Sequence, residues 1–364
     1  MISKHKAVFL TGGTGLVGSY LLKLLLSSNR KVYVLARDKD RDCAKYRVIK
    51  LLQFWNNAIA KNKIRNLFVL KGDITKENLG LDKNTISLLS NEVEEVFHSA
   101  AATQFNKGLL DLRNINVLGT RRLLNLGLKW VTTGSLRRIN YLSTAYICGN
   151  YSGVFKESDL DLGQEFATPY EQAKFETEEM LHDYRKKGLW IDIFRCPAIV
   201  GEYSSGKIHL FNQALYQALH ILSLGIFEYF PINDNQKFNM VCIDELCKSI
   251  LSISNSSLHR NITYHNFANQ SLSLKYILNL FIKFLNLKKL KYISQKEFLQ
   301  EKSTVLQRRI LEYNFFFIYS KAKLDSRYTN NLLKCYGFCF SEINEKILLK
   351  LFNYPLKKGF IKKK

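Results

Sequence analysis

The sequence predicts an α/β fold with a doubly wound parallel sheet and a smaller, mostly helical C-terminal region. Two observations carry this prediction. Short apolar runs alternate with longer helical patterns through the first two hundred residues, which is typical of parallel strands joined by crossover helices. A glycine-rich turn also separates the first apolar run from the first helical pattern. The length of 364 residues, with 46% hydrophobic side chains, supports a folded chain with a large core.

The predicted elements follow from these patterns in chain order. Each strand is a short apolar run, and each helix is a longer segment with apolar residues at helical spacing. Strands are expected at 7–10, 32–35, 67–70, 95–98, 139–142 and 191–194, and helices at 15–28, 42–60, 119–130 and 168–187. A strand and helix at 238–250 and a strand at 262–267 are expected to rejoin the sheet. The domain boundary is therefore placed after residue 203, with 238–270 returning to the first domain.

Residues 204–237 and 271–364 are expected to form a variable region beside the sheet. Within it, 208–227 lacks Asp, Glu, Lys and Arg, yet polar residues such as His209 and Gln213 interrupt the apolar run. Apolar residues recur there at helical spacing. The segment is predicted to be an amphipathic helix on a globular body, and no transmembrane segment is expected.

The net charge is +23, and residues 271–364 contribute 20 Lys and Arg against 6 Asp and Glu. Lysines on solvated helix faces explain this excess, and attraction to an acidic partner protein is the second interpretation. Nucleic acid is not expected as a partner. Peripheral contact with a membrane and formation of an oligomer both stay open.

Cysteine and histidine residues show no metal-binding pattern. The closest cysteine spacings, Cys242 to Cys247 and Cys335 to Cys339, fit neither a zinc site nor a redox pair. The seven histidines are scattered. Together with the absence of a secretory signal in residues 1–10, this predicts reduced thiols, no metal and a cytoplasmic location.

The glycine-rich turn has the sequence TGGTGLVG, residues 11–18, between the first strand and an apolar helix. Glycine permits the tight turn and allows backbone N–H groups to approach a pyrophosphate at the helix N-terminus. A turn without a ligand is the alternative, which the complete strand-turn-helix context disfavours. The sequence therefore predicts a Rossmann-like dinucleotide-binding domain, with the cofactor held by Thr11, Gly12, Thr14, Gly15, Leu16, Val17 and Gly18.

The residue at the end of the second strand distinguishes between the two nicotinamide cofactors. An acidic residue there binds the ribose of NAD, whereas an arginine accommodates the 2′-phosphate of NADP. Arg37 occupies this position, but Asp38 follows at once, and a shift of one residue would change the interpretation. NADPH is the expected cofactor, with NADH as the alternative.

Two further segments carry the candidate catalytic residues. Tyr170 and Lys174 lie four residues apart at the start of a predicted helix, so both lie on one face. A phenol, with a pKa of ~10, becomes a useful proton donor at neutral pH when a cation stabilises its anion. Ser143 and Thr144 place two hydroxyls at the end of a predicted strand, where open α/β sheets bind ligands.

With these motifs together, the sequence resembles the extended short-chain dehydrogenase/reductase superfamily over most of its first 270 residues. The resemblance rests on TGGTGLVG at 11–18, GDIT at 72–75, HSAAA at 98–102, NVLGT at 116–120, YLSTAY at 141–146, YEQAK at 170–174 and RCPAIVG at 195–201. It implies a catalytic triad of Thr144, Tyr170 and Lys174. It also implies cofactor contacts from Asp73, Ile74, Ala100, Ala101, Ala102, Asn116, Tyr170, Lys174, Pro197, Ile199 and Val200. Aligning Gly149 with the glycine that closes the family's strand-end motif selects Thr144 over Ser143.

Within the superfamily, the sequence is similar to the thioester-reductase and fatty acyl reductase branch, whose NAD(P)-binding domain is called the male-sterility type. The similar segments are AKYR at 44–47, ATQFN at 102–106, STAY at 143–146, GE at 201–202 with SG at 205–206, and the tail 351–360. This likeness implies NADPH-dependent reduction of an acyl thioester to an aldehyde or an alcohol. Because the sequence shows no adenylation or carrier segment, the acyl group is expected to arrive in trans, on coenzyme A or an acyl carrier protein.

Two other functions stay open. The first is a sugar-nucleotide epimerase or dehydratase, or a hydroxysteroid-type dehydrogenase, of the same superfamily. Arg37 disfavours the epimerase, and Ala145 and Tyr146 stand where a dehydratase needs its acidic pair. The second is a non-catalytic NADP-binding regulator, which tends to lose the tyrosine or the lysine that are both present here.

Overall fold

The computed structural model describes residues 7–56, 61–104, 107–232, 236–256, 261–269, 271–315, 318 and 320–362. Residues 57–60 of the expected helix 42–60 and residues 105–106 of the segment similar to thioester reductases lie outside this description. The chain divides into two compact units. The first contains residues 1–144, 172–195 and 250–264, and the second contains 145–171, 196–249 and 265–364.

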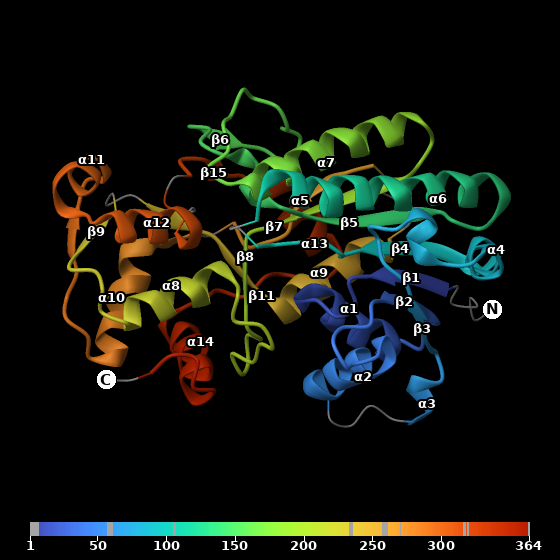
Figure 1. The fold of residues 1–364 in the computed structure, drawn as a ribbon, viewed down its shortest axis with the longest axis horizontal. Helices are drawn as coiled ribbons and strands as arrows, with labels where there is room; N and C mark the ends of the chain where they lie inside the picture. The colour runs from blue at the N-terminus through green and yellow to red at the C-terminus, as the bar shows by residue number, and fades with distance from the viewer. Residues whose placement is uncertain are drawn as a thin grey trace. The chain divides into compact units, whose positions relative to one another are not determined.

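A seven-stranded parallel sheet in the order β12-β7-β5-β4-β1-β2-β3 forms the centre of the first unit, which confirms the predicted fold class (Figure 1). Its strands are β1 (Ala7–Thr11), β2 (Val32–Ala36), β3 (Leu67–Lys71), β4 (Val93–His98), β5 (Arg138–Thr144), β7 (Ile191–Cys196) and β12 (Thr263–His265). Five of them, β1, β2, β4, β5 and β7, are almost wholly buried, as strands covered on both faces must be. The chain runs outward from β1 through β2 in one direction and from β4 through β5 in the other. The order therefore reverses between β1 and β4.

Helices cover both faces of this sheet (Figure 1). The helices of the first unit are α1 (Leu16–Ser27), α2 (Ala44–Trp55), α3 (Lys61–Ile64), α4 (Lys83–Glu92), α5 (Leu109–Leu112) and α6 (Gly119–Thr133), and α7 (Pro169–Lys186) begins in the second unit and continues into the first. One core cluster packs Phe9 of β1 and Val96 of β4 against Leu124 and Trp130 of α6. The rings of Phe9 and Trp130 meet edge to face at 5.7 Å.

The second unit combines short strand pairs with helices. Its strands are β6 (Val154–Phe155), β8 (Ala198–Val200), β9 (Tyr229–Pro231), β10 (Lys237–Phe238), β11 (Met240–Cys242), β13 (Leu272–Ser273), β14 (Lys291–Ile293) and β15 (Lys323–Leu324). Its helices are α8 (Ala214–Ser223), α10 (Leu274–Leu285), α11 (Gln295–Glu297), α12 (Val305–Asn314), α13 (Arg327–Cys335) and α14 (Glu345–Lys357), and α9 (Ile243–Ser254) begins in this unit and ends in the first. Phe281 of α10 and Phe352 of α14 meet edge to face at 5.3 Å.

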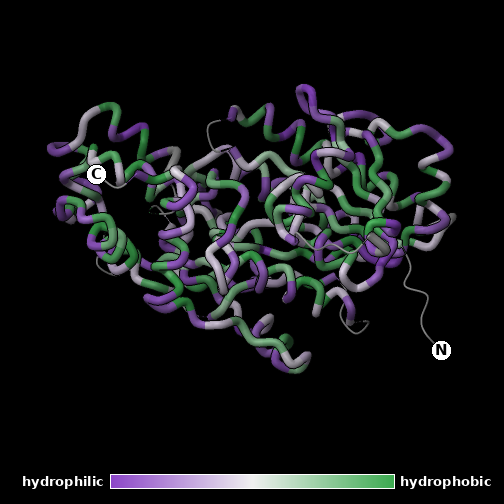
Figure 2. Tube along the Cα trace, turned by 90° about the horizontal axis from the view of Figure 1, so that it is seen from below, coloured by the Kyte–Doolittle hydropathy of each residue, from purple (hydrophilic) through white to green (hydrophobic). Residues whose placement is uncertain are grey.

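Two expectations for this region were wrong in detail. Only β12 joins the central sheet, whereas β11 pairs with β8 and β10 pairs with β13. The helix expected over 208–227 is confined to α8, because the Gln217 side chain donates to the Phe211 carbonyl at 2.9 Å and Gln213 has an extended backbone. Within the described residues, no helix has the length and hydrophobicity needed to cross a membrane. The hydropathy trace shows the same mixing of polar and apolar positions (Figure 2).

Candidate functional site

A cavity of roughly 180 Å³ opens in the first unit where the strand order reverses. Loops that follow β1 and β4 form two of its walls, and the ends of β2 and β3 form the others. Of the residues expected to bind the cofactor, it brings together Gly12, Thr14, Gly15, Arg37, Asp73, Ile74, Ala100 and Ala101. Open α/β sheets bind nucleotides at this kind of reversal, at the carboxyl ends of the strands.

The glycine turn depends on close backbone approach. Gly12 has a φ of +75°, and a Cβ atom there would lie 2.5 Å from the Ala100 backbone nitrogen in the loop after β4. A Cβ atom on Gly18, in the first turn of α1, would lie 2.2 Å from the Gly12 carbonyl oxygen. Gly12 and Gly18 therefore close the turn against the sheet and the helix, while Gly15 lines the cavity.

The end of α1 that faces this turn suits an anion. Gly15 is the N-cap of α1, no side chain caps the helix, and no acidic residue lies in its first turn. The partial positive charge of the helix end is therefore not offset by a carboxylate from that turn. Leu16, Val17 and Gly18 lie within this buried first turn. These features fit the pyrophosphate of a dinucleotide.

β2 ends at Ala36, and the next residue, Arg37, lines the cavity with 64% of its side chain exposed. Its Nη1 lies 3.4 Å from the Asp73 carboxylate, and its carbonyl accepts a bond from Arg47 at 2.5 Å. Asp38 is used elsewhere: it accepts the Ala44 N–H at 2.8 Å and pairs with Lys71 at 2.6 Å. The Lys71 ammonium lowers the pKa of Asp38. Of the neighbouring charged residues Arg37 and Asp38, it is therefore Arg37 that lines the cavity.

Several expected cofactor residues have side chains that hold the protein together beneath the cavity. The Thr11 hydroxyl lies 2.6 Å from Nδ1 of His98, whose Nε2 lies 2.9 Å from the Thr120 hydroxyl. Burial, together with the nearby Lys174 charge, lowers the pKa of His98 to about 3, so the ring is neutral at physiological pH. The Asn116 side chain makes two bonds to the backbone of Ala102, at 2.8 and 3.0 Å. These bonds position the strand ends and the loop after β4.

Lys174 lies in α7 with only 1% of its surface exposed. Its ammonium donates to the Leu142 carbonyl at 2.8 Å and to the Tyr141 hydroxyl, and both partners lie on β5. A buried ammonium needs such partners, because an unpaired charge in the interior is costly. Lys174 is therefore fixed on the strand that ends in Thr144.

The two hydroxyls at the end of β5 have different surroundings. The Ser143 hydroxyl donates to Glu178 of α7 at 2.5 Å, and Glu178 forms a fully buried ion pair with Arg195 of β7 at 2.8 Å. Ser143 therefore belongs to a structural network. Thr144, the last residue of β5, is the hydroxyl that the family alignment selected.

The start of α7 sets the position of Tyr170. The Thr168 N–H donates to the Glu171 carboxylate at 2.9 Å, and the Glu171 N–H donates to the Thr168 hydroxyl at 3.3 Å. This reciprocal capping box, with Pro169 as first helical residue, begins the helix at a defined point. Burial raises the pKa of Glu171 to about 7. Tyr170 lies in this first turn, 9% exposed, one turn before Lys174.

The remaining expected cofactor residues lie in the second unit. Pro197 is buried and precedes β8, which contains Ile199 and Val200. Ala198 and Val200 pair in parallel with Met240 and Cys242 of β11.

Sequence reasoning assigned no role to Tyr141, Thr168 or Glu171. The capping box could have been recognised from the Thr-Pro-Tyr-Glu sequence at 168–171, since Thr and Glu three residues apart before a helix are its signature. The contact between Tyr141 and Lys174 could not have been recognised from the sequence, because it joins β5 to α7 across 33 residues. Among the described residues, no group of His, Cys, Asp and Glu could hold a metal ion.

Comparison with known families and proteins gives matches that cover most of the chain. The NAD-binding family model described as Male sterility protein matches residues 10–250. The nonribosomal peptide synthetase asaC of Aspergillus flavus is 29% identical over 269 residues, which are 71% of this chain and 26% of that protein. The chain spans about a quarter or less of the length of the curated relatives it matches.

Two solved structures share the fold. The terminal R domain from the myxalamid PKS-NRPS biosynthetic pathway is 20% identical with a TM-score of 0.83, covering 100% of this chain and 93% of that one. A thiolation-reductase di-domain from an archaeal nonribosomal peptide synthetase is 22% identical with a TM-score of 0.80, covering 99% of this chain and 77% of that one.

Proposed function

Because the chain belongs to the male sterility protein family, a family of NAD-binding domains in the extended short-chain dehydrogenase/reductase superfamily of oxidoreductases, we propose that it is an NADPH-dependent reductase of an acyl thioester. The thioester is carried by coenzyme A or by an acyl carrier protein, and the product is an aldehyde or an alcohol. The observation that carries the proposal is the buried Lys174 ammonium, bonded to the strand that ends in Thr144. The names of the relatives support it, since they describe peptide synthetases, a terminal R domain and a thiolation-reductase pair.

In this proposal residues 1–203 bind the cofactor, and residues 204–237 with 271–364 bind the acyl substrate. Of the segment 238–270, which was expected to return to the first domain, β12 is the strand that joins the cofactor-binding sheet. The glycine turn holds the pyrophosphate and Arg37 the 2′-phosphate. Asp73 and Ile74 flank the adenine, while Ala100, Ala101 and Ala102 line the cofactor under β4. Pro197, Ile199 and Val200 contact the nicotinamide. The expected location is the cytoplasm.

The chemistry is divided among three side chains. Bound NADPH supplies a hydride to the thioester carbonyl carbon. Thr144 and Tyr170 donate hydrogen bonds to the carbonyl oxygen, and Tyr170 gives its proton to the oxyanion that develops there. Lys174 stabilises the tyrosinate left behind and binds the cofactor ribose. As the C–S bond breaks, the new hydroxyl returns its proton to the tyrosinate and the leaving sulfur takes a proton from water, which releases the thiol and leaves the aldehyde. A second NADPH would supply the hydride for reduction of the aldehyde to the alcohol.

A test of the function is the reaction itself. Purified protein with NADPH and a panel of acyl-CoA thioesters of graded chain length is expected to lose nicotinamide absorbance and to release free thiol. Reduction to the aldehyde releases one thiol for each NADPH consumed. Reduction to the alcohol consumes two NADPH for each thiol released. Oxidation of NADPH without thiol release would contradict thioester reduction. Turnover that prefers NADH with UDP-sugars would favour the sugar-nucleotide alternative.

Cofactor choice is tested at Arg37. Replacing Arg37 with Ala is expected to raise the KM for NADPH by about tenfold and to leave the KM for NADH nearly unchanged, because only NADPH has a 2′-phosphate to bind. The matched change Asp38→Asn keeps NADPH preference, since Asp38 already bonds Ala44 and Lys71. Equal effects of Arg37→Ala on both cofactors would show that Arg37 does not recognise the 2′-phosphate.

A further inference from the structure

The second unit contains a cavity of roughly 380 Å³ that the proposed chemistry does not use. Three lysines line it, together with amide and hydroxyl side chains, and none of the described residues that line it is acidic. Its polar lining includes Lys237, Lys321, Lys323, Gln236, Asn239 and Ser320. We call it the lysine cavity. Its size is in the usual range for small-molecule sites, which hold ~300–1,000 Å³.

Local structure holds the two lysine-bearing walls together. Lys237 lies on β10, which pairs antiparallel with β13. Lys323 lies on β15, which pairs with β6, and its backbone N–H donates to the Gly153 carbonyl at 2.8 Å. The Gln236 side chain joins the walls, because it donates to the Ser320 carbonyl at 3.0 Å. Lys237 therefore lies on β10, Lys323 on β15, and Lys321 on the segment that leads into β15.

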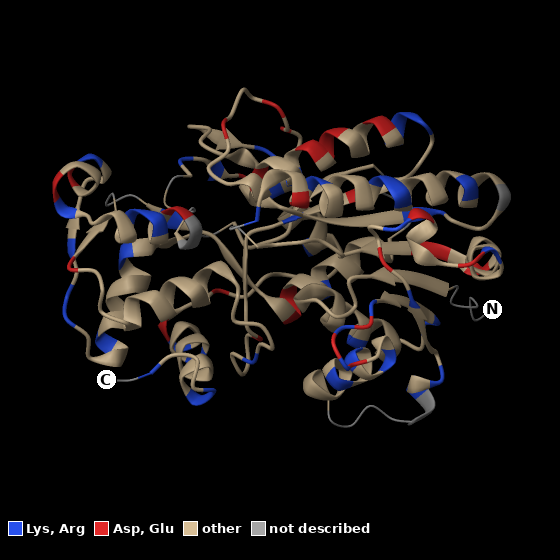
Figure 3. Ribbon diagram, viewed as in Figure 1, with Lys and Arg blue, Asp and Glu red and all other residues tan. Residues whose placement is uncertain are grey.

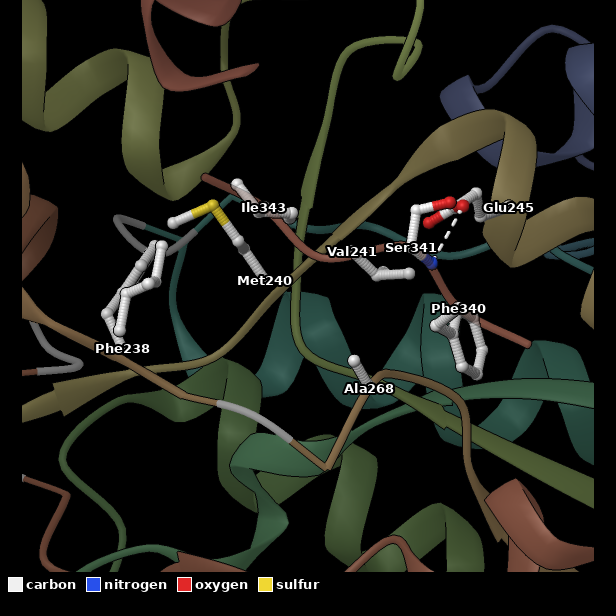
Figure 4. Close-up of a pocket in the computed structure, with 9 residues that line it drawn as sticks. Phe238, Met240, Val241, Glu245, Ala268, Phe340, Ser341 and Ile343 are labelled. Carbon is white, nitrogen blue, oxygen red and sulfur yellow. Dashed lines mark hydrogen bonds between the residues drawn. The ribbon is translucent and has the colours of Figure 1, made fainter. Parts of the chain in front are cut away.

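Strand alternation separates this cavity from the core of the second unit. Lys237 and Asn239 line the lysine cavity, whereas Phe238 between them is buried and faces a small apolar cavity with Met240 and Phe340 (Figure 4). The apolar cavity measures only about 20 Å³, and the Ser341 N–H donates to the Glu245 carboxylate at its edge, at 3.0 Å. It is therefore packed core, and a ligand of any size fits only on the polar side.

The lysine cavity also adjoins the strand pair that we propose to contact the nicotinamide. The Asn239 carbonyl accepts the Ala198 N–H at 3.3 Å, and the next residue, Met240, is in register with Ala198 of β8. Many other Lys and Arg of residues 271–364 are spread along α10, α12 and α14 (Figure 3), whereas Lys321 and Lys323 lie with Lys237 at this cavity. At this cavity three lysines are gathered around one concave site.

We propose that the lysine cavity binds the phosphate of a phosphopantetheine arm, the group that coenzyme A and acyl carrier proteins share. Lysine ammonium groups bind phosphate as point charges, and the amide and hydroxyl groups supply further hydrogen bonds. The thioester end of the arm then extends toward β8. This inference rests on the proposed function, since the arm is what carries the acyl group.

Binding is measured first, without turnover. Calorimetry with the full chain is expected to show that 4′-phosphopantetheine binds about tenfold more tightly than pantetheine, which lacks the phosphate. Lys321→Ala and Lys323→Ala each remove this difference. Lys346→Ala, which removes one exposed charge from α14, is the matched control and keeps it. Equal affinity for the two compounds in the unaltered protein would overturn the proposal.

Kinetics then identifies the carrier. With acyl-CoA, acyl-phosphopantetheine and acyl carrier protein, Lys321→Ala is expected to raise KM about tenfold, while KM for an acyl N-acetylcysteamine thioester stays unchanged. A rise with acyl-CoA alone would overturn the shared-phosphate assignment and place a nucleotide phosphate in the cavity. If 4′-phosphopantetheine binds in a lysine-dependent way but the protein reduces no thioester, the proposed function is refuted and the phosphate site in the lysine cavity stands. If the protein reduces thioesters but Lys321→Ala and Lys323→Ala change neither binding nor KM, the proposed function stands and the phosphate site is refuted.

Discussion

Replacing Tyr170 with Phe is expected to lower kcat for thioester reduction by roughly 10²–10⁴-fold, the usual contribution of a positioned proton donor. The phenyl ring keeps the packing of a side chain that is only 9% exposed, so the fold is retained. The lost hydroxyl removes both the proton and a hydrogen bond to the carbonyl oxygen. NADPH affinity stays within about threefold, because Lys174 and the glycine turn are unchanged. The measurement is stopped-flow nicotinamide absorbance, with NADPH affinity from fluorescence.

A second tyrosine on the same helix serves as the control. The Tyr184 hydroxyl donates to Asn125 at 2.5 Å, and Tyr184→Phe removes that hydroxyl from the C-terminal half of α7. This variant is expected to keep kcat while losing about 1 kcal/mol of unfolding free energy. Undiminished kcat in Tyr170→Phe would refute the assignment of Tyr170 as proton donor and favour a non-catalytic NADP-binding role.

Breaking the ion pair between Glu178 and Arg195 is expected to lower the stability of the protein strongly. Both side chains are fully buried, 2.8 Å apart, and Glu178 also accepts the Ser143 hydroxyl. Glu178→Leu leaves the Arg195 charge without its carboxylate, so the free energy of unfolding falls by about 3–5 kcal/mol. The same is expected of Arg195→Met. Urea unfolding followed by circular dichroism measures both.

The double variant separates the pair from its surroundings. Glu178→Leu with Arg195→Met removes both charges, so it should recover most of the loss of either single change. The exposed pair Lys186–Asp183, on the same helix, is the control: Asp183→Ala should shift the unfolding midpoint very little. Single variants as stable as the unaltered protein would show that water or another group solvates the remaining charge. Additive losses in the double variant would contradict direct coupling.

The central sheet and its glycine turn could be predicted because their signals are local. A buried parallel strand is a short apolar run, and a crossover helix repeats its apolar residues every three or four positions, so six strands and their order along the chain follow from the sequence. The turn at 11–18 follows from glycine conformation and the flanking elements. The helix boundaries of α1 and α7 agree with expectation to within one residue.

Only the tertiary structure decided which groups meet across long stretches of chain. It bonded Asp38 to Lys71 and left Arg37 at the cofactor cavity, it committed Ser143 to Glu178, and it gave Lys174 its partner Tyr141. The tertiary structure also shows that β11, which was expected in the central sheet, pairs with β8 instead. Spacing in sequence carries no signal for such contacts, because strand pairing and side-chain hydrogen bonds depend on how elements pack.

The lysine cavity shows the same division. The sequence alone established a basic chain, with +14 of its +23 charge in the last quarter, and a dinucleotide-binding turn near its start. It could not distinguish solvated lysines from lysines that gather around one site. Lys237 and Lys323 are 86 positions apart, and only the pairing of β10 with β13 and of β15 with β6, joined by Gln236, brings them to one cavity. Charge is a property of composition, whereas its convergence is a property of packing.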